Sequence, residues 1–235
     1  MLASYDFKIT NKSGVDRIAM VGDSITAGIY LSEEKRMTYL LQEKMNQAMT
    51  GEGKIEVLNF GVNGYSTEQE ARQMKTLVNS FKPDLVVVNY YLNDPEPSWT
   101  PCICFIDNKP RGLRLYHFIK MRFDHADNQF HPNLSPIEHT AGWELFYNKN
   151  LKVLNDSFNE IALWSRKCEM PMLFTIFPFL LEGETGKDLA SRWNLKVEAM
   201  VEAYGWPVIN LWEDYYEKHR VEDVISSSTD FYHPS

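Results

Sequence analysis

Residues 17–28 read RIAMVGDSITAG, an apolar run that ends in an Asp-Ser pair between two glycines. A short continuous apolar run is typical of a strand that is buried on both faces of a parallel sheet. Glycines and an Asp-Ser pair directly after such a run indicate a tight turn into a helix. Ser24 is therefore either a turn and cap residue or a nucleophile held at the mouth of a site. The stretch allows both roles, and only features elsewhere in the chain can separate them.

The rest of the chain repeats this alternation of apolar runs and helical segments. Further strands are predicted at residues 55–60, 85–91, 172–177 and 207–211. Helical periodicity fills the intervals at residues 32–49, 67–81, around 151–161 and 187–204. Thr67 and Glu70 match a capping box, which predicts where the second of these helices begins. Buried strands that alternate with helices predict an α/β fold with a parallel, doubly wound sheet.

Length and charge exclude several classes of protein. A chain of 235 residues is long enough for one sizeable core, so a single domain over residues 1–235 is expected. The net charge of -8 disfavours binding to nucleic acid, which requires clustered Lys and Arg. No apolar run approaches the roughly 20 residues of a membrane span. The N-terminus lacks a signal-peptide pattern, so a cytoplasmic location is the default expectation, although a removed signal leaves secretion open.

The three cysteines, Cys102, Cys104 and Cys168, do not have the spacing of a metal knuckle or a redox pair. Reduced thiols packed as small apolar side chains are expected. The alternative is a disulfide between Cys168 and one of the other two.

The region at about residues 95–143 interrupts the alternation. It contains six prolines, many aromatic residues and four of the six histidines, and it is too long for a simple connection. We interpret it as an insertion that covers the end of the sheet; the alternative is a surface excursion with no role at a site. Its histidines lack the spacing of metal ligands, so we expect them on the surface and predict no metal site. These histidines are residues 117, 125, 131 and 139.

Chemically capable residues follow the predicted strands. In open parallel sheets, ligands bind beyond the carboxyl ends of the strands. The first strand is followed by Ser24, the second by a glycine turn that contains Gly64, and the third by Asn93. Asp230 and His233 lie beyond the fifth strand. Each of these features is ordinary alone, but all of them would meet at one edge of the sheet.

Together these residues match the requirements of a serine nucleophile. Of the six histidines, only His233 has a carboxylate three residues earlier, at Asp230. In an extended turn, that carboxylate can reach one imidazole nitrogen and leave the other as a base. Ser24, His233 and Asp230 are thus predicted as nucleophile, base and orienting acid. The backbone N–H groups of Ser24 and Gly64 and the side-chain amide of Asn93 are predicted to form the oxyanion hole.

Four motifs in this order resemble the motif blocks of the SGNH (GDSL-type) hydrolase family. They are GDSI at residues 22–25, NFGVNGYS at 59–66, ND at 93–94 and DFYHP at 230–234. The resemblance spans about residues 17–235, interrupted by the insertion. It implies a three-layer α/β/α sandwich with a five-stranded parallel sheet in flavodoxin-like order. It also implies ester hydrolysis without metal or cofactor, through an acyl-enzyme on serine.

The sequence departs from this family at two points. The asparagine block usually reads Gly-x-Asn-Asp, and Tyr91 occupies the glycine position here. A tyrosine at this position is expected to narrow the acyl side of the pocket or to shift Asn93. Family members also usually continue past the His-Pro with a helix that packs on the sheet. Because the sequence stops at Ser235, a C-terminal truncation is expected.

The predicted function is a serine esterase for a short-chain ester, in particular an O-acetyl ester on a carbohydrate. The carbohydrate part rests on the habit of the family and on aromatic residues near the predicted edge, which are Trp99, Trp143, Tyr90 and Tyr91. An O-acyltransferase that uses the same site is an alternative, and so is a non-catalytic carbohydrate-binding domain. The expected partner is a small-molecule or carbohydrate ester. The sequence leaves the oligomeric state open.

Overall fold

The computed structural model describes residues 13–29, 31–91, 95, 136–177, 183–212, 225–227 and 230–234, and only the backbone at 136–146, 183–187 and 225–234. Five parallel strands form one sheet in the order β2-β1-β3-β4-β5. They are β1 (Val15–Gly22), β2 (Lys54–Gly61), β3 (Leu85–Tyr90), β4 (Met172–Ile176) and β5 (Val208–Asn210). The predicted α/β class and the flavodoxin-like strand order are thereby confirmed.

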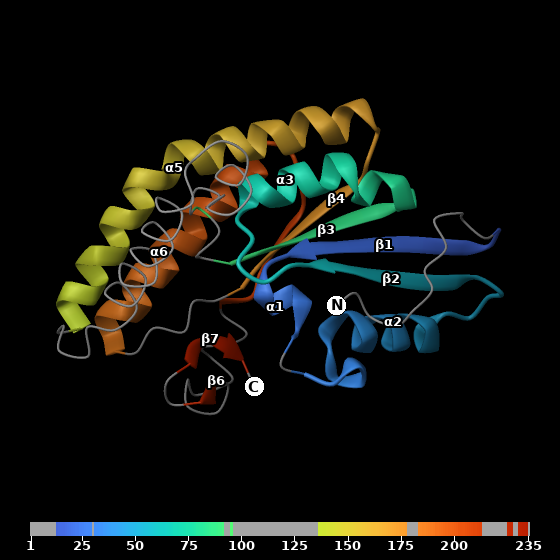
Figure 1. Ribbon diagram of the computed structural model, residues 1–235, viewed down its shortest axis with the longest axis horizontal. Helices are drawn as coiled ribbons and strands as arrows, with labels where there is room; N and C mark the ends of the chain where they lie inside the picture. Colours follow the sequence, from blue (N-terminus) through green and yellow to red (C-terminus); the bar gives the residue numbers. More distant parts are fainter. Residues whose placement is uncertain are drawn as a thin grey trace, which may run out of the picture.

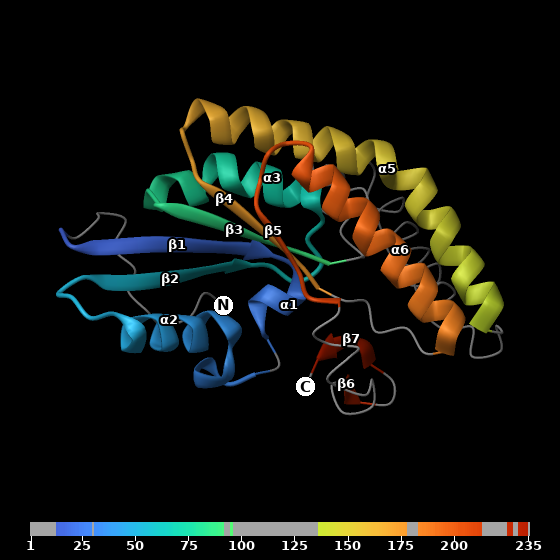
Figure 2. The ribbon, with the colours of Figure 1, turned by 180° about the vertical axis from the view of Figure 1, so that it is seen from behind.

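Helices cover both faces of this sheet and make three layers (Figures 1 and 2). The helices are α1 (Ser24–Ala27), α2 (Met37–Ala48), α3 (Thr67–Thr76), α5 (Pro136–Lys167) and α6 (Gly183–Glu202). Two 3-10 turns, η1 (Glu33–Lys35) and η2 (Val78–Phe81), flank α2 and α3. Helices α3, α5 and α6 lie on one face, and α2 lies on the other. The right-handed crossovers of a sheet in this order require that distribution.

The two cores explain why the strands read as continuous apolar runs. Along β1, Ala19 and Val21 belong to the large core under α3, α5 and α6. Ile18 and Met20 alternate with them and belong to the smaller core under α2. Because successive side chains of a strand point to opposite faces, a strand covered on both sides must be apolar throughout.

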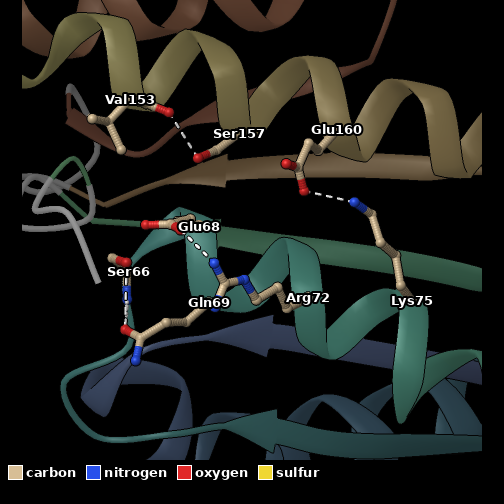
Figure 3. A network of polar contacts seen from close by, with 8 residues as sticks. All are labelled: Ser66, Glu68, Gln69, Arg72, Lys75, Val153, Ser157 and Glu160. Atoms are coloured by element: carbon tan, nitrogen blue, oxygen red, sulfur yellow. Dashed lines mark hydrogen bonds and ion pairs between the residues drawn. The ribbon is translucent and has the colours of Figure 1, made fainter. Parts of the chain in front are cut away.

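The N-cap of helix α3 lies one residue earlier than the predicted capping box placed it. It is Ser66, which forms a reciprocal capping box with Gln69, whose side-chain oxygen accepts from the Ser66 N–H at 3.0 Å. Figure 3 shows this contact together with the Lys75–Glu160 ion pair, at 2.6 Å, between α3 and α5. The prediction of a Thr67–Glu70 box is wrong because Thr67 is already helical. Glu70 points into the protein instead and is fully buried.

The insertion ends earlier than expected. Helix α5 begins at Pro136 and runs for 32 residues, so residues 136–143 are its first turns and not part of the insertion. Proline suits this first helical position because the N–H that it lacks has no partner within the helix there. Apart from Pro95, the rest of the insertion lies outside the described residues, as do Cys102 and Cys104. Cys168 is a free thiol, so its predicted alternative as a disulfide partner is not supported.

Helix α2 is shorter than predicted, and its apolar face is a single row of residues. Met37, Leu41 and Met45, spaced four residues apart, pack against the sheet. Leu40 lies to one side of that row and is 45% exposed. Met49 was expected in the helix and is its C-cap residue.

A buried arginine joins three segments at the end of the sheet where the strands begin. The Nε of Arg17 on β1 donates to the Glu56 carboxylate on β2 at 3.0 Å. Its Nη1 donates to the carbonyl oxygen of Phe81 at 3.0 Å, and its backbone N–H donates to the Asp84 carboxylate at 2.7 Å. Arg17 thus connects β1 with β2, with η2 and with the loop that leads into β3, opposite the end where the predicted site lies.

Two short antiparallel strands, β6 (Ile225–Ser227) and β7 (Asp230–Pro234), lie near the carboxyl ends of the large sheet (Figures 1 and 2). Strand β7 contacts α1. The segment that carries Asp230 and His233 is therefore next to the helix that Ser24 begins.

Candidate active site

The turn after β1 is held by Asp23. The Asp23 carboxylate accepts from the Ile25 N–H at 2.9 Å, and its backbone carbonyl accepts from the Ala27 N–H at 3.0 Å. Asp23 is therefore the N-cap of α1, and Ser24 is the first helical residue. The Ser24 hydroxyl lies 3.5 Å from the Asp23 carboxylate and does not cap the helix. Of the two roles that the sequence allowed for Ser24, the capping role belongs to its neighbour.

Two glycines allow α1 to lie directly on the strand ends. A Cβ on Gly22 would come within 2.2 Å of the Thr26 hydroxyl oxygen and 2.9 Å of the Asn89 carbonyl oxygen. A Cβ on Gly61 would come within 2.2 Å of the Ala27 nitrogen. Heavy atoms cannot approach so closely, so any larger residue at either position would push α1 away from the sheet. The glycines of the first two motifs thus have a packing role that fixes the place of Ser24.

Polar side chains from the strands hold the same helix. The Asn59 amide donates to the Thr26 carbonyl oxygen at 2.9 Å, and its oxygen accepts from the Gly61 N–H at 2.9 Å. The Asn89 amide donates to the Thr26 hydroxyl at 2.9 Å and accepts from the Thr175 hydroxyl. Strands β2, β3 and β4 all contribute to this network. The sequence analysis missed these residues, although an asparagine inside the apolar run LVVVNYY at 85–91 is a usable signal.

The turn after β2 places Gly64 at the same end of the sheet as Ser24, since Gly61 pairs with Gly22 in the β1–β2 register. The Val62 N–H donates to the Gly22 carbonyl at 3.0 Å and connects this turn to the end of β1, directly before the turn that carries Ser24. Gly64 has φ +75°, a conformation that favours glycine. Unlike Gly22 and Gly61, it is exposed, and a Cβ there would meet no atom within 4 Å. Among the described residues, the position that a Gly64 Cβ would occupy is thus open.

A second carboxyl, besides that of Asp23, lies buried near the turn that carries Ser24. Glu70 on α3 is fully buried, and both of its carboxyl oxygens lack a hydrogen-bond partner. Burial raises the pKa of Glu70 well above its ordinary value of 4.5, and the nearby charge of Asp23 raises it further. Asp23 is itself 1% exposed. The sequence analysis gave Glu70 only a role in helix capping.

The structure describes part of the predicted constellation. Ser24 and Gly64 lie at one end of the sheet, and β7, with Asp230 and His233, contacts α1. Asn93 lies outside the described residues, so its role and the expected effect of Tyr91 on it stay predictions.

The aromatic residues do not lie as expected. Tyr90 and Tyr91 are buried in the large core and present no surface on which a sugar could stack. Trp143 is part of α5, and Trp99 lies outside the described residues. Tyrosine at the end of β3 instead fills the interior beneath the helical layer, since the Tyr90 ring meets that of Phe158 edge-on at 6.3 Å.

Within the part of the chain that the structure describes, no cluster of three or more His, Cys, Asp or Glu side chains is arranged to hold a metal ion. No helix among the same residues is long and apolar enough to cross a membrane.

Several solved structures with a similar fold are described as esterases. AlinE4, described as an SGNH-hydrolase family esterase, superposes with a TM-score of 0.55 at 15% identity, covering 92% of this chain and 86% of that chain. A variant of Axe2, an acetyl-xylooligosaccharide esterase from Geobacillus Stearmophilus, gives 0.54 at 17% identity, with 94% and 87% covered. The psychrotrophic esterase EstA from Pseudoalteromonas sp. gives 0.54 at 15% identity, with 94% and 88% covered. No curated protein sequence matches the chain significantly.

At these identities the structures establish the fold alone. The family comes from the sequence itself, because the model of the GDSL-like lipase/acylhydrolase family matches residues 20–235. That span contains the nucleophile turn, the glycine turn and the Asp-x-x-His segment. The chain belongs to the GDSL-like lipase/acylhydrolase family, a family of serine ester hydrolases, and has the fold of the SGNH hydrolases.

Proposed function

We propose that this protein is a serine esterase that cleaves short-chain carboxylic esters through an acyl-enzyme on Ser24. The observation that carries the proposal is the position of Ser24. It begins a helix that glycines and strand side chains hold against the sheet, and the segment with Asp230 and His233 contacts that helix. A nucleophile held on a rigid element next to its base is what nucleophilic catalysis requires.

In the proposed mechanism, His233 removes the proton of the Ser24 hydroxyl while Asp230 stabilises the resulting imidazolium. The Ser24 oxygen attacks the ester carbonyl, and the negative charge moves to the carbonyl oxygen. The tetrahedral intermediate then collapses, and His233 gives its proton to the departing alcohol. Water activated by His233 attacks the acyl-enzyme, which releases the carboxylic acid and restores the Ser24 hydroxyl.

The oxyanion is proposed to bind the backbone N–H groups of Ser24 and Gly64 and the side-chain amide of Asn93. The fixed turn supports this role for Ser24, because donors that are already oriented need no rearrangement as charge develops. The open side of Gly64 supports the second donor. Removing one such donor typically lowers kcat by about 10²–10³-fold.

The proposed substrate is a short acyl ester, in particular an O-acetyl group on a carbohydrate. Two observations support this substrate class: the fold likeness with Axe2, described as an acetyl-xylooligosaccharide esterase, and the residue that follows β3. At Tyr91, where the family motif usually has glycine, a bulky side chain is buried at this end of the sheet. Such bulk favours a small acyl group over a long chain.

The test of the nucleophile is hydrolysis of p-nitrophenyl acetate by the wild type, Ser24→Ala and His233→Ala. Ser32→Ala is a matched control, because Ser32 is an exposed serine that precedes η1. We expect both site variants to lose activity while melting at the wild-type temperature, and the control to keep it. A fluorophosphonate probe should modify Ser24, which peptide mass spectrometry would detect. Equal labelling of the wild type and Ser24→Ala would refute this role.

The test of the substrate is a panel of p-nitrophenyl esters from acetate to octanoate, with acetylated xylooligosaccharides added in parallel. Activity should fall as the acyl chain lengthens. The same reactions with an added acceptor sugar measure acyl transfer. Free acetate as the sole product would support a hydrolase, whereas a newly acetylated acceptor would make the protein an acyltransferase.

A further inference from the structure

A row of four aligned residues lies beside α1 at the carboxyl end of the sheet. Each residue of the row is the register partner of the next one. They are Gly61 on β2, Gly22 on β1, Asn89 on β3 and Thr175 on β4. Aligned residues of parallel strands point to the same face of the sheet. Because the two glycines have no side chain, α1 lies directly on them, and Asn89 is the next residue of the row that the helix meets.

Thr26 is the residue of α1 that contacts both parts of this row. A Cβ on Gly22 would lie 2.2 Å from the Thr26 hydroxyl oxygen, so the threonine side chain occupies the space beside that glycine. The same hydroxyl accepts from the Asn89 side-chain amide at 2.9 Å. The Thr26 carbonyl accepts from the Asn59 amide at 2.9 Å. Helix α1 is therefore connected to β2 through its backbone and to β3 through a side chain.

Asn89 is held in turn by Thr175. The side-chain oxygen of Asn89 accepts from the Thr175 hydroxyl, and its nitrogen donates to the Thr26 hydroxyl. An asparagine amide presents an acceptor and a donor on neighbouring atoms, which an aliphatic side chain does not. Asn89 is 2% exposed, so bulk water does not compete for either hydrogen bond. The contact with Thr175 thus fixes the plane of the amide and directs its N–H toward Thr26.

The network specifies the position of α1 more narrowly than apolar packing would. Asn89 follows the three consecutive valines at residues 86–88, where a fourth valine would continue the buried strand. A buried hydrogen bond adds little net stability, but its geometry is strict. A buried network in which every member has its partner favours one arrangement over slightly shifted ones. The mechanism proposed above uses neither Asn89 nor Thr26.

We propose that Asn89 is a positioning residue for the nucleophile: held by Thr175, it fixes α1 through the Thr26 hydroxyl and thereby orients the hydroxyl and the N–H of Ser24. The link to activity rests on the proposed function, whereas the effect of Asn89 on α1 does not. Thr26 lies two residues after Ser24 in the same helical turn, so a shift of one moves the other. A misplacement of about 1 Å in a reacting group can lower a rate by about 10²-fold.

The variants separate the hydrogen bond from the packing of the side chain. Thr26→Val removes the hydroxyl and keeps the shape, whereas Thr26→Ser keeps the hydroxyl and removes the methyl group. Thr67→Val is the matched control. It makes the same change at a threonine that is also 1% exposed, but whose hydroxyl has no hydrogen-bond partner in the described part of the chain. Asn89→Leu and Thr175→Val remove the other two members of the network.

The first readout is the hydrolysis of p-nitrophenyl acetate. Thr26→Val and Asn89→Leu should each lower kcat about tenfold at unchanged KM, the effect of losing one hydrogen bond of ordinary strength. Thr26→Ser and Thr67→Val should stay within about threefold of the wild type. Thr175→Val should also lower kcat. Adding it to Thr26→Val should cause no further loss, because the direction of the amide no longer matters once its acceptor is gone.

The second readout is amide hydrogen exchange, which does not need activity. The Ala27 N–H donates to the Asp23 carbonyl and the Gly28 N–H to the Ser24 carbonyl, both at 3.0 Å, so their exchange rates report the opening of α1. Relative to the amides of β1, these two rates should rise about tenfold in Thr26→Val and in Asn89→Leu. They should stay at the wild-type values in Thr26→Ser and in Thr67→Val.

The two readouts separate the two proposals. If the wild type does not hydrolyse the ester but exchange at Ala27 and Gly28 rises in Thr26→Val and Asn89→Leu, the proposed function fails and the role of Asn89 in fixing α1 stands. If exchange stays at the wild-type rates in both variants, Asn89 does not fix α1. If exchange rises but hydrolysis keeps its wild-type kcat, Asn89 does not position the nucleophile.

Two further outcomes would also overturn the proposal. If Thr26→Ser loses as much kcat as Thr26→Val, the packing of the methyl group holds α1 and the hydrogen bond to Asn89 does not. If the losses from Thr26→Val and Thr175→Val multiply in the double variant, Thr175 does not act through Asn89.

Discussion

The backbone of Gly61 lies so close to that of Ala27 that a Cβ on Gly61 would come within 2.2 Å of the Ala27 nitrogen. The atoms in contact are backbone atoms, which cannot rotate away as a flexible side chain can. A residue at the end of β2 therefore fixes the helix that Ser24 begins. The place of the predicted nucleophile depends on a glycine that need not touch a substrate.

Gly61→Ala should consequently destabilise the protein by about 3 kcal/mol, because the added methyl group overpacks a backbone contact. Gly64→Ala is the matched control. A methyl group there meets no atom, so only the strain of φ +75° remains, worth about 1–2 kcal/mol. Urea denaturation of both variants measures the difference. If both variants lost the same free energy of unfolding, α1 would be able to move away from the sheet with little loss of stability.

Replacement of the buried Arg17 should strongly lower the free energy of unfolding. Arg17→Met leaves the Glu56 carboxylate without its partner in a buried setting and should cost about 3–5 kcal/mol. Arg72→Met removes an exposed pair with Glu68 and should cost less than about 1 kcal/mol. Free energies of unfolding, compared at low and high salt, would test both values. A small effect at Arg17 would show that the guanidinium is dispensable.

Ser66 and Thr67 are neighbours at the start of α3, but substitutions at the two positions should change the stability differently. Ser66→Ala removes the capping side chain and should lower stability by about 1 kcal/mol. Thr67→Val removes a buried hydroxyl that has no hydrogen-bond partner, so stability should stay the same or rise. Thermal denaturation of both variants would test these two expectations. If Thr67→Val destabilised the protein more than Ser66→Ala, the capping box that the sequence predicted, with Thr67 as the N-cap, would be supported instead.

Glu70 should also make the stability depend on pH. Its folded pKa is raised above 4.5, so the folded protein keeps a proton that the unfolded chain releases. Stability is then greatest below the unfolded pKa and is lost as the pH rises toward the folded pKa, at up to about 1.4 kcal/mol per pH unit. Glu70→Gln should lack this contribution. The difference in free energy of unfolding between the two proteins should therefore widen from pH 5 to pH 8, and a constant difference would contradict it.

Much of the architecture was predictable because burial on both faces leaves a strong pattern. Five apolar runs matched the five strands, and motifs at the strand ends resembled one family with one strand order. Errors arose where neighbouring residues are chemically alike. Ser66 and Thr67 can both cap a helix, and only the backbone conformation shows which one does. Pro136 was counted with the insertion, although proline can equally begin a helix.

Ser24 and Gly64 follow neighbouring strands, and β7 contacts α1, as the sequence predicted, whereas the catalytic roles of these residues stay predictions. The supporting residues were missed because their roles depend on contacts between strands far apart in sequence. Asn89 looks like a polar interruption of an apolar run until Thr26 and Thr175 lie on either side of it. Likewise, nothing in the stretch TEQEARQM distinguishes the exposed Glu68 side of the helix from the buried Glu70 side until α3 is placed on the sheet.

The contact between α1 and β7 has a consequence for biosynthesis. It joins segments near the two ends of the sequence, with about two hundred residues between them. Closing a loop of that length costs about 5 kcal/mol in chain entropy, so this contact is expected to form after the sheet has brought its ends together. On the ribosome, the sheet can assemble as each strand emerges, while the segment that contains β7 is still inside the exit tunnel. If the proposed roles hold, a nascent chain would already be folded around Ser24 yet unable to attack an ester until β7 has emerged.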